Sequence, residues 1–346
     1  MRELRKQHNF LRRTIQMLER KTAFITGING QDGSYLSELL LEKGYTVIGL
    51  VRRLSVPESQ TSRLEEAGVY PNPNLHLEYG DLTDQSSIFR ILSKYKPDEI
   101  YNLAAQSHVR VSFDVPHFTT DTIALGTLNL LEAVRSCCPN SKFYQAGSSE
   151  MFGNSIDLDG FQRESTPMIP VSPYGCAKLY AHNLAGVYRD SYQMFICGGI
   201  LFNHESPRRG KNFVTNKIVE GAVKIFKGEL SSLSLGNLEA TRDWGHSKDY
   251  VRAMWMMLQQ DYPKDYVCAT GRSHSVGDVV KYVFSKLDLL PIEQFIKIDP
   301  KYFRPKELNN LKGDSSLLRK ELGWKPEYTF EMLLDEMVKS KMDQNK

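Results

Sequence analysis

A glycine-rich turn near the start of the chain places the strongest constraint on the fold. Residues Lys21–Thr26 form a short apolar, β-rich run, and the turn Gly27–Gly33 carries glycines at its first, fourth and seventh positions. A helical pattern follows over Ser34–Lys43. In a strand, turn and helix of this order, the backbone approaches a pyrophosphate closely and the helix N-terminus faces its negative charge. The segment predicts a dinucleotide-binding turn; a glycine-rich turn that binds no ligand is the plainer alternative.

Strand-like runs and helical patterns continue to alternate as far as Asn203. The further runs are Thr46–Val51, Leu75–Tyr79, Ile100–Ala105, Phe143–Ala146 and Met194–Phe202. Repeated alternation of this kind predicts an α/β fold, a Rossmann-type doubly wound parallel sheet with helices on both faces. The pattern then becomes irregular, with a helix expected over Val214–Phe226. We expect a smaller portion here, interleaved with late elements of the core.

The second run ends in Arg52 and Arg53, where a site that prefers NAD usually places an acid for the ribose 2′-hydroxyl. Two guanidinium groups suit a 2′-phosphate, so the pair favours NADP; a solvated basic turn is the alternative. Other strand ends should line the same crevice. The cofactor-binding residues expected from these segments are Gly27, Asn29, Gly30, Gln31, Asp32, Gly33, Asp81, Leu82, Leu103, Ala104 and Ala105.

Two later stretches supply reactive groups. Tyr174 and Lys178 are four residues apart, which places them on one face of a helix. The positive charge of Lys178 can lower the pKa of the phenol from about 10, and a phenolate is a good base for an alcohol proton. A helix-surface pair is the plainer interpretation of this spacing. Ser148 and Glu150, in another turn, add a hydroxyl and a carboxylate.

Composition excludes several classes of function. The net charge of +3 is too small to indicate nucleic-acid binding. The five cysteines show no C-x-x-C or His/Cys metal spacing, so we expect a reducing cytoplasm and no metal. No apolar run reaches the length that spans a bilayer. Residues 1–20 form a basic, weakly amphipathic extension, expected to be disordered or packed on the surface, with organelle targeting as the alternative.

From about Lys21 to Met342, the chain resembles the GDP-mannose 4,6-dehydratase family of extended short-chain dehydrogenases/reductases. The resemblance rests on blocks that are more specific than the glycine turn. These blocks are Gly27–Tyr35, Leu103–Val109, Phe202–Gly210, Asn212–Thr215, Leu235–Leu238, Arg242–His246 and Tyr302–Pro305.

The resemblance implies a reaction in three steps. Tyr174 would remove the C4 hydroxyl proton of the sugar while hydride passes to NADP, with Lys178 lowering the phenol pKa and holding the nicotinamide ribose. Glu150 would take the C5 proton and help the 6-hydroxyl leave as water, after which hydride returns to C6. Ser148, which stands where the family usually has Thr, would bond the C4 oxygen.

The resemblance also implies further binding residues. Arg242 and Arg304 suit a diphosphate. The nucleotide-sugar site would comprise Asn203, Lys217, Arg242, Arg304 and Glu307. The added cofactor contacts would be Gln106, Ser107, Lys178, His204 and Arg209. We expect an NADP-binding domain with the catalytic residues over 21–203, a mainly nucleotide-sugar-binding portion over 204–346, and a homo-oligomer, either a dimer or a tetramer.

Two other classes of function stay open at this point. A non-catalytic NADP-binding protein would be expected to have lost Tyr174, Lys178 or Glu150, and this chain keeps all three. A related enzyme could act on another nucleotide sugar, as a GDP-heptose 4,6-dehydratase or a 4-epimerase. Epimerases do not need a carboxylate at Glu150, so its presence favours elimination. The choice between mannose and heptose, and any further reduction of the product, are left open.

Overall fold

The centre of the molecule is a seven-stranded parallel sheet with the strand order β10-β6-β5-β4-β1-β2-β3. The computed structural model describes residues 20–53, 61–303, 306, 308 and 310–344. Residues 1–19 of the expected extension, Arg304 and Glu307 lie outside the described residues. The strands are β1 Thr22–Thr26, β2 Thr46–Val51, β3 Leu75–Tyr79, β4 Glu99–Asn102, β5 Lys142–Ala146, β6 Ile196–Leu201 and β10 Tyr266–Cys268. The predicted parallel sheet is confirmed.

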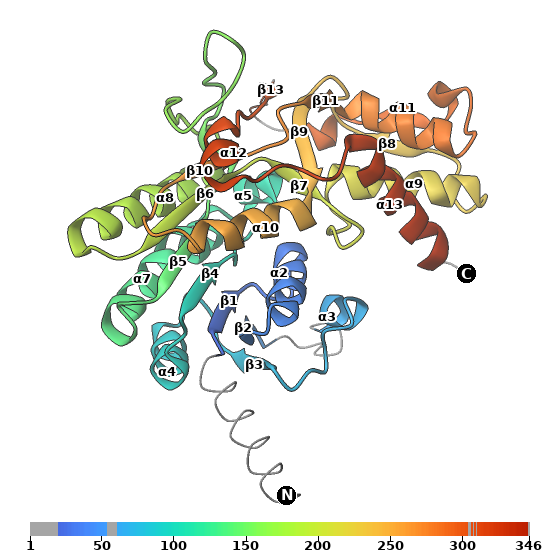
Figure 1. Cartoon of the computed structure of the whole chain (residues 1–346). Coiled ribbons are helices and arrows are strands. Elements are labelled where there is room, and N and C mark those ends of the chain that lie inside the picture. The colour runs from blue at the N-terminus through green and yellow to red at the C-terminus, as the bar shows by residue number, and fades with distance from the viewer. Residues whose placement is uncertain (1–19, 54–60, 304–305, 307, 309, 345–346) are drawn as a thin grey trace, which may run out of the picture.

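Helices cover both faces of this sheet (Figure 1). On one face, α2 (Gln31–Glu42) and α10 (Ser247–Leu258) pack on the side chains of Ile25 and Val47. On the other, α4 (Gln85–Tyr95), α7 (Gly126–Cys137) and α8 (Pro173–Tyr192) pack on Phe24 and Ile48. Neighbouring residues of one strand therefore enter opposite hydrophobic clusters, as the two-residue period of a strand requires. This explains why β1, β2 and β6 are almost entirely apolar, whereas the edge strand β3 includes His76 and Glu78.

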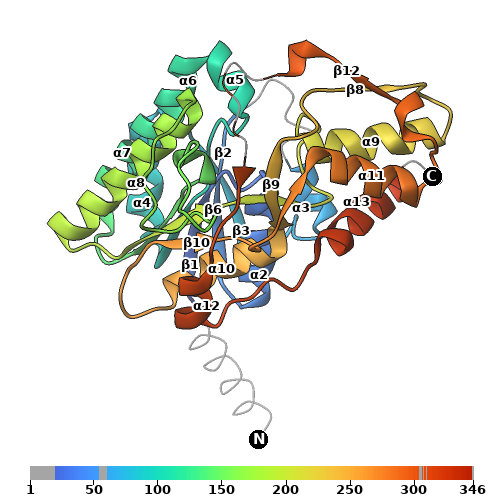
Figure 2. The same cartoon turned by 90° about the horizontal axis from the view of Figure 1, so that it is seen from above.

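The smaller portion consists of short strands and three helices (Figure 2). Its helices α9 (Val214–Phe226), α11 (Val276–Lys286) and α13 (Phe330–Gln344) share one hydrophobic cluster. A four-stranded sheet joins β7 (Asn203–Glu205), β9 (Thr241–His246), β11 (Ser273–Ser275) and β13 (Asn310–Leu311), and a second pair joins β8 (Leu233–Leu235) to β12 (Ile296–Ile298).

The two portions are interleaved along the chain. After β9 has been laid down, the chain returns to the large sheet to add α10 and the edge strand β10, which pairs with β6. Helix α12 (Ser316–Leu322) then contributes Leu318 to the cluster that contains α2 and α10. The remaining short elements are α3 Ser62–Glu66, α5 Val109–Asp114, α6 Pro116–Thr120, η2 Asp121–Leu125, η3 Ser149–Met151, η4 Ile292–Gln294 and η5 Pro300–Tyr302.

Several predicted boundaries differ from the structure, and hydrogen bonds explain the two largest differences, at α2 and β4. Helix α2 begins at Gln31 rather than Ser34, because Gly30 N–H donates to the Gly27 carbonyl at 2.9 Å and closes the turn three residues earlier. Strand β4 ends at Asn102 rather than Ala105. The amides of Leu103 and Ala104 donate to Thr26 Oγ1 at 3.0 and 3.1 Å, which bends the chain away from the strand.

Among the described helices, none combines the length and the apolar character needed to cross a bilayer. The described residues likewise contain no group of three or more His, Cys, Asp or Glu side chains arranged to hold a metal ion.

The glycine turn brings two backbone segments into unusually close contact. A Cβ atom on Gly33 would lie 2.4 Å from the carbonyl oxygen of Gly27 and 2.6 Å from Cα of Ile28. Gly27 itself has a φ of +70°, a conformation that residues with a side chain rarely adopt. The first turn of α2 can therefore lie against the end of β1 only with glycine at both positions.

We predict that Gly33→Ala destabilises the protein, because the new methyl group meets backbone atoms that cannot move independently. The expected loss is about 1–3 kcal/mol in the free energy of unfolding. Gly186→Ala, inside α8 with its closest contact at 3.6 Å, serves as the control and should stabilise the protein by about 0.5–1 kcal/mol. Denaturant unfolding of both variants measures the contrast, and a neutral Gly33→Ala would contradict the packing argument.

Candidate active site

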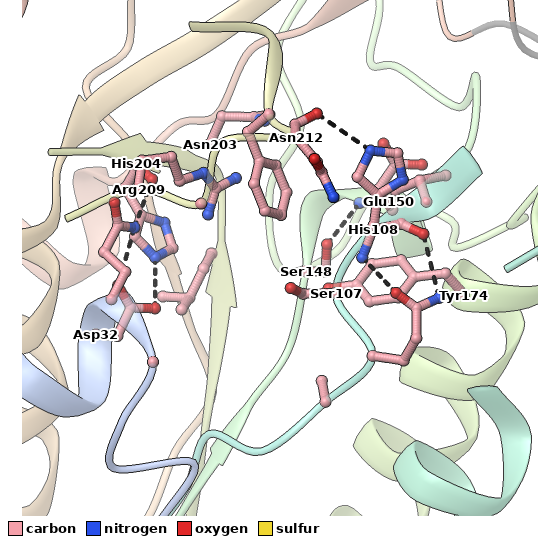
Figure 3. A pocket seen from close by; sticks show the side chains of 18 of the residues that line it. Asp32, Ser107, His108, Ser148, Glu150, Tyr174, Asn203, His204, Arg209 and Asn212 are labelled. Atoms are coloured by element: carbon pink, nitrogen blue, oxygen red, sulfur yellow. Dashed lines mark hydrogen bonds and ion pairs between the residues drawn. The ribbon is translucent and has the colours of Figure 1, made fainter. Parts of the chain in front are cut away.

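The carboxyl ends of the central strands open into a cavity of about 860 Å³ that is also lined by the smaller portion. With the exception of Arg53, every described residue expected for catalysis, cofactor or substrate lines this one cavity. Figure 3 shows Asp32, His204 and Arg209 at one end and Ser148, Glu150 and Tyr174 at the other. Residues from distant parts of the sequence are thus brought together at the edge of the sheet where parallel strands place binding sites.

Ser148 and Glu150 follow strand β5 in a tight turn. The Ser148 hydroxyl oxygen accepts the Glu150 amide at 3.2 Å and caps the short 3₁₀ helix η3. Both side chains are largely buried. A Cβ atom on Gly175 would lie 2.8 Å from the Glu150 carbonyl oxygen, so glycine there lets α8 pack closely on this turn. The close packing holds the carboxylate and the hydroxyl beside the N-terminus of α8.

Tyr174 and Lys178 project from the first turns of α8, as their spacing predicts. The helix begins at Pro173, and its N-cap Ser172 accepts the Gly175 amide at 3.0 Å. Lys178 Nζ donates to the Ala146 carbonyl oxygen at 2.8 Å, which ties α8 to the end of β5. The same Nζ lies 5.9 Å from the centroid of the Tyr174 ring.

The expected lowering of the Tyr174 pKa by Lys178 is not found in this structure. Burial raises the pKa of Tyr174 to about 12, and the hydrogen bond from Ser148 opposes this increase without overcoming it. Burial also lowers the pKa of Lys178 to about 8, and the charge of Asp32 opposes that shift only in part. The sequence argument considered the pair's attraction and omitted the cost of removing both groups from water.

The N-terminus of α2 faces the same cavity. Among the described residues, no side chain caps it: its N-cap is Gly30, and the following residues Gln31, Asp32 and Gly33 all line the cavity. Open amide groups at a helix N-terminus form a site for an anion such as a diphosphate. Asp32 on this turn pairs with His204 of β7, with Oδ2 and Nε2 2.8 Å apart.

The two arginines at the end of β2 differ in their position. Arg52 lines the cavity, and its Nε lies 3.9 Å from Oδ2 of Asp81. Arg53 is not among the described lining residues; its guanidinium lies 5.9 Å from the centroid of the Tyr79 ring. The structure therefore separates two residues that the sequence treated as equivalent.

The part of the cavity wall that the smaller portion forms contains the residues expected to bind a nucleotide sugar. Lys217 Nζ donates to the Ser234 carbonyl oxygen at 2.7 Å and lies 3.4 Å from the centroid of the Tyr302 ring. Arg242 is buried, and its Nη1 donates to the Leu308 carbonyl oxygen at 2.9 Å. These contacts fix the position of two cations in the wall of the cavity, which Asn203 also lines.

The lining residues outside the predicted site include Arg63, His108 and Phe213. Arg63 Nη1 donates to the Asn29 carbonyl oxygen at 3.0 Å, which adds a cation beside the glycine turn. His108 Nε2 lies 3.3 Å from the Asn212 carbonyl oxygen, and its ring packs 5.6 Å from that of Phe213, joining two loops across the cavity. His108 stands directly after Gln106 and Ser107, which was the available signal; Arg63 has no motif around it.

The parallel sheet, the glycine turn and the Tyr174–Lys178 pair together define an extended short-chain dehydrogenase/reductase. Solved structures share this fold. The dTDP-glucose 4,6-dehydratase of Streptomyces venezuelae aligns with a TM-score of 0.83 at 23% identity, covering 94% of this chain and 98% of that one. The UDP-glucose 4-epimerase of Thermus thermophilus aligns with a TM-score of 0.80 at 24% identity, covering 93% and 99%.

The family model for GDP-mannose 4,6 dehydratase matches residues 24–337, and the chain belongs to this family. GDP-mannose 4,6 dehydratase 1 of Arabidopsis thaliana is 52% identical, over 92% of this chain and 89% of the relative. The human GDP-mannose 4,6 dehydratase is 48% identical, over 92% and 91%. The GDP-mannose 4,6-dehydratase of Vibrio cholerae is 48% identical, over 94% and 95%.

We predict that Lys178→Met makes the protein without cofactor more stable at pH 7. Burial lowers the pKa of Lys178 from 10.5 to about 8, so at pH 7 the folded protein holds a charged ammonium that is less stable there than in the unfolded chain. Between about pH 8 and pH 10.5 the folded state has lost this proton while the unfolded chain keeps it, so wild-type stability rises with pH over this range. The variant should gain roughly 2–3 kcal/mol at pH 7. Its advantage should narrow towards pH 10 while its activity is lost.

Urea unfolding at the two pH values measures this difference. Lys320→Met, at an exposed position of α12, is the matched control and should show no such pH-dependent gain. A Lys178→Met protein that is less stable than wild type at pH 7 would show that the buried ammonium does not lower the free energy of unfolding.

Proposed function

We propose that the protein converts GDP-mannose into GDP-4-keto-6-deoxy-mannose, with NADP as its cofactor. The observation that carries this proposal is the meeting of Glu150 with Ser148, Tyr174 and Lys178 in one cavity. The last three residues suffice for proton transfer at an alcohol. Glu150 adds the base that an elimination needs, and the membership of the GDP-mannose 4,6 dehydratase family supports the same reaction.

The cavity suits a dinucleotide. The uncapped N-terminus of α2 provides amide groups for the diphosphate, and the close backbone contact at Gly33 keeps that helix end against the turn. Arg52 is the cation that would meet a 2′-phosphate, and Lys178 would meet the nicotinamide ribose. Bound NADP supplies the hydride acceptor and the hydride donor of the reaction.

We assign the roles of the side chains on the sequence resemblance, and the meeting of these side chains in one cavity supports the assignment. Tyr174 removes the proton of the C4 hydroxyl, and Ser148, which already hydrogen-bonds the phenol, holds the C4 oxygen beside it. A positive nicotinamide ring would favour the phenolate, as the hydrogen bond from Ser148 and the charge of Arg209 do, in opposition to the burial that raises the pKa of Tyr174. Glu150 then takes the C5 proton, which the C4 ketone makes acidic, and delivers a proton to the departing 6-hydroxyl.

The nucleotide end of the substrate meets the cations of the smaller portion. Arg242 and Lys217 line this end of the cavity, and we assign them to the GDP moiety, with Asn203 nearer the sugar. We assign Arg304 and Glu307 to the same site on the sequence resemblance alone. Whether the sugar is mannose or a heptose is decided by a direct comparison of the two GDP-sugars.

The homo-oligomer and the cytoplasmic location belong to the same proposal. The neighbouring helices η2 and α8 carry exposed apolar side chains, which support self-association. These side chains are Leu125, Tyr180 and Val187. All five cysteines of the chain are free thiols, which suits a reducing compartment.

Incubation with GDP-mannose and NADP tests the activity directly, with mass analysis of the product. The proposal requires the loss of one water from the sugar. A product of unchanged mass with inverted C4 would indicate an epimerase, and turnover of GDP-heptose in preference to GDP-mannose would reassign the sugar. dTDP-glucose serves as the control for the nucleotide.

We predict that Glu150→Gln binds NADP normally but lowers the rate of water loss by about 100-fold or more, because the amide cannot accept the C5 proton. In deuterated water, the variant should also fail to introduce deuterium at C5. Glu229→Gln, at an exposed position after α9, is the control. Normal deuterium incorporation in the Glu150→Gln product would assign the base elsewhere.

We predict that Arg52→Asp weakens NADP far more than NAD, by about 1.5–3 kcal/mol, because a charge-assisted hydrogen bond to the 2′-phosphate is lost. Arg53→Asp carries the same change of charge one residue further along, at a position outside the described cavity lining. Its effect should be much smaller. Titration of both variants with both cofactors gives the four constants, and an equal loss for NAD and NADP in Arg52→Asp would contradict the assignment.

A further inference from the structure

The imidazole ring of His204 has an acceptor against each of its two nitrogens. Nδ1 lies 2.8 Å from the Phe202 carbonyl oxygen, and Nε2 lies 2.8 Å from Oδ2 of Asp32 (Figure 3). A carbonyl oxygen can only accept a hydrogen bond, so Nδ1 carries a proton. A carboxylate also accepts, so Nε2 carries the second proton. A histidine that donates from both nitrogens is an imidazolium ion.

The surroundings place the shared proton on His204 rather than on Asp32. Asp32 lies in the first turn of α2, where the peptide dipoles stabilise a negative charge, and Gln31 Nε2 donates to its Oδ1 at 3.3 Å. Burial on its own would raise the pKa of Asp32, but the charge and hydrogen bond of His204 hold it below its usual value. Burial would likewise lower the pKa of His204, but Asp32 raises it.

The pair lies where the proposed function places the cofactor diphosphate. Asp32 and His204 line the cavity together with Gly30, at the uncapped N-terminus of α2. A lone carboxylate in this turn would repel a diphosphate, and the repulsion would be strong because the site is buried. A positive charge on His204, whose Nε2 lies 2.8 Å from Oδ2 of Asp32, removes most of that repulsion.

We propose that His204 is a positioning residue whose imidazolium cancels the charge of Asp32 and so permits a dinucleotide diphosphate to bind at α2. The proposal rests on the proposed function, since it concerns the cofactor of that reaction. The cofactor should therefore bind most tightly where His204 is protonated. Its affinity should fall as rising pH removes that proton and leaves Asp32 without its nearest cation.

The other titratable groups near the ring do not replace this pairing. Tyr250 of α10 stacks on the ring with centroids 4.4 Å apart, and it is a neutral phenol below pH 10. Arg209 forms its ion pair with Glu205 at 2.9 Å, and His246 of β9 lies against Tyr328 and Glu336. Lys178 of α8 faces Asp32 from the catalytic end of the cavity. The titratable groups that act on His204 itself are Asp32, Arg209 and Tyr250; Arg209 also lowers the pKa of Asp32.

The charge state is tested first in the protein without any ligand. With the histidine ring nitrogens labelled with nitrogen-15, both nitrogens of His204 should be protonated at pH 7, and the signal should disappear in His204→Gln. This measurement does not depend on the reaction. A neutral ring at pH 7 would overturn the proposal whatever the enzyme catalyses.

The effect on binding is tested with three variants and NADP titrations between pH 6 and pH 9. His204→Gln keeps a donor towards Asp32 but removes the charge, so its affinity at pH 7 should fall about tenfold or more. Asp32→Asn/His204→Gln, which carries neither charge, should recover most of the wild-type affinity. Asp32→Asn on its own removes both the anion and the charge that raises the pKa of His204, so it should bind about as tightly as the double variant.

The pH profiles separate charge from structure. Wild-type affinity should decline across the titration of His204, and the His204→Gln profile shows the background from the cofactor's own phosphate. The pair would be a structural contact alone if the double variant bound NADP no more tightly than His204→Gln. The same conclusion would follow if wild type and His204→Gln had identical pH profiles of affinity. Wild-type protein that binds neither NADP nor NAD at any pH would instead refute the proposed function.

Discussion

The hydrogen bond between the buried ammonium of Lys178 and the carbonyl oxygen of Ala146 is the contact around which the rest of the cavity is arranged. It joins the first turns of α8 to the last residue of β5, so the helix and the turn that carries Ser148 and Glu150 keep one relative position. Gly175 has no side chain, which allows the two segments to come into contact. A hydroxyl, a carboxylate, a phenol and an amine from two segments thereby become one reactive group.

The charges in the cavity form a second level of organisation. Asp32 influences Lys178 and Tyr174 at one end and pairs with His204 at the other, so it links the anion site of α2 to the catalytic residues. Burial makes each of these groups costly in its charged form. Several charged groups of the same cavity therefore lower the free energy of unfolding, as is common where a protein holds reactive groups away from water.

The fold was largely predictable because the strands of the central sheet are rich in apolar and aromatic residues and most of their connections contain a helical pattern. The strand ends were less predictable, since the bend after Asn102 depends on the Thr26 hydroxyl, a partner 77 residues away from Leu103. The described residues that were predicted from recognisable motifs line the cavity, with the exception of Arg53. Arg63 was not, because only the three-dimensional path of the chain brings α3 beside the glycine turn. The direction of the Tyr174 pKa shift was wrong because burial has no local sequence signal.

The late return of the chain to the large sheet has a consequence for how such a protein can be divided or assembled. A segment that ended at residue 203 would lack β10, α10 and α12, so the edge of β6 and the outer surface of α2 would face water. Neither portion is a module that can be removed or exchanged as a block. Diversification of the sugar pocket must therefore proceed by substitution within the loops, and a ribosome has to release almost the entire chain before the first-made strands can be fully covered.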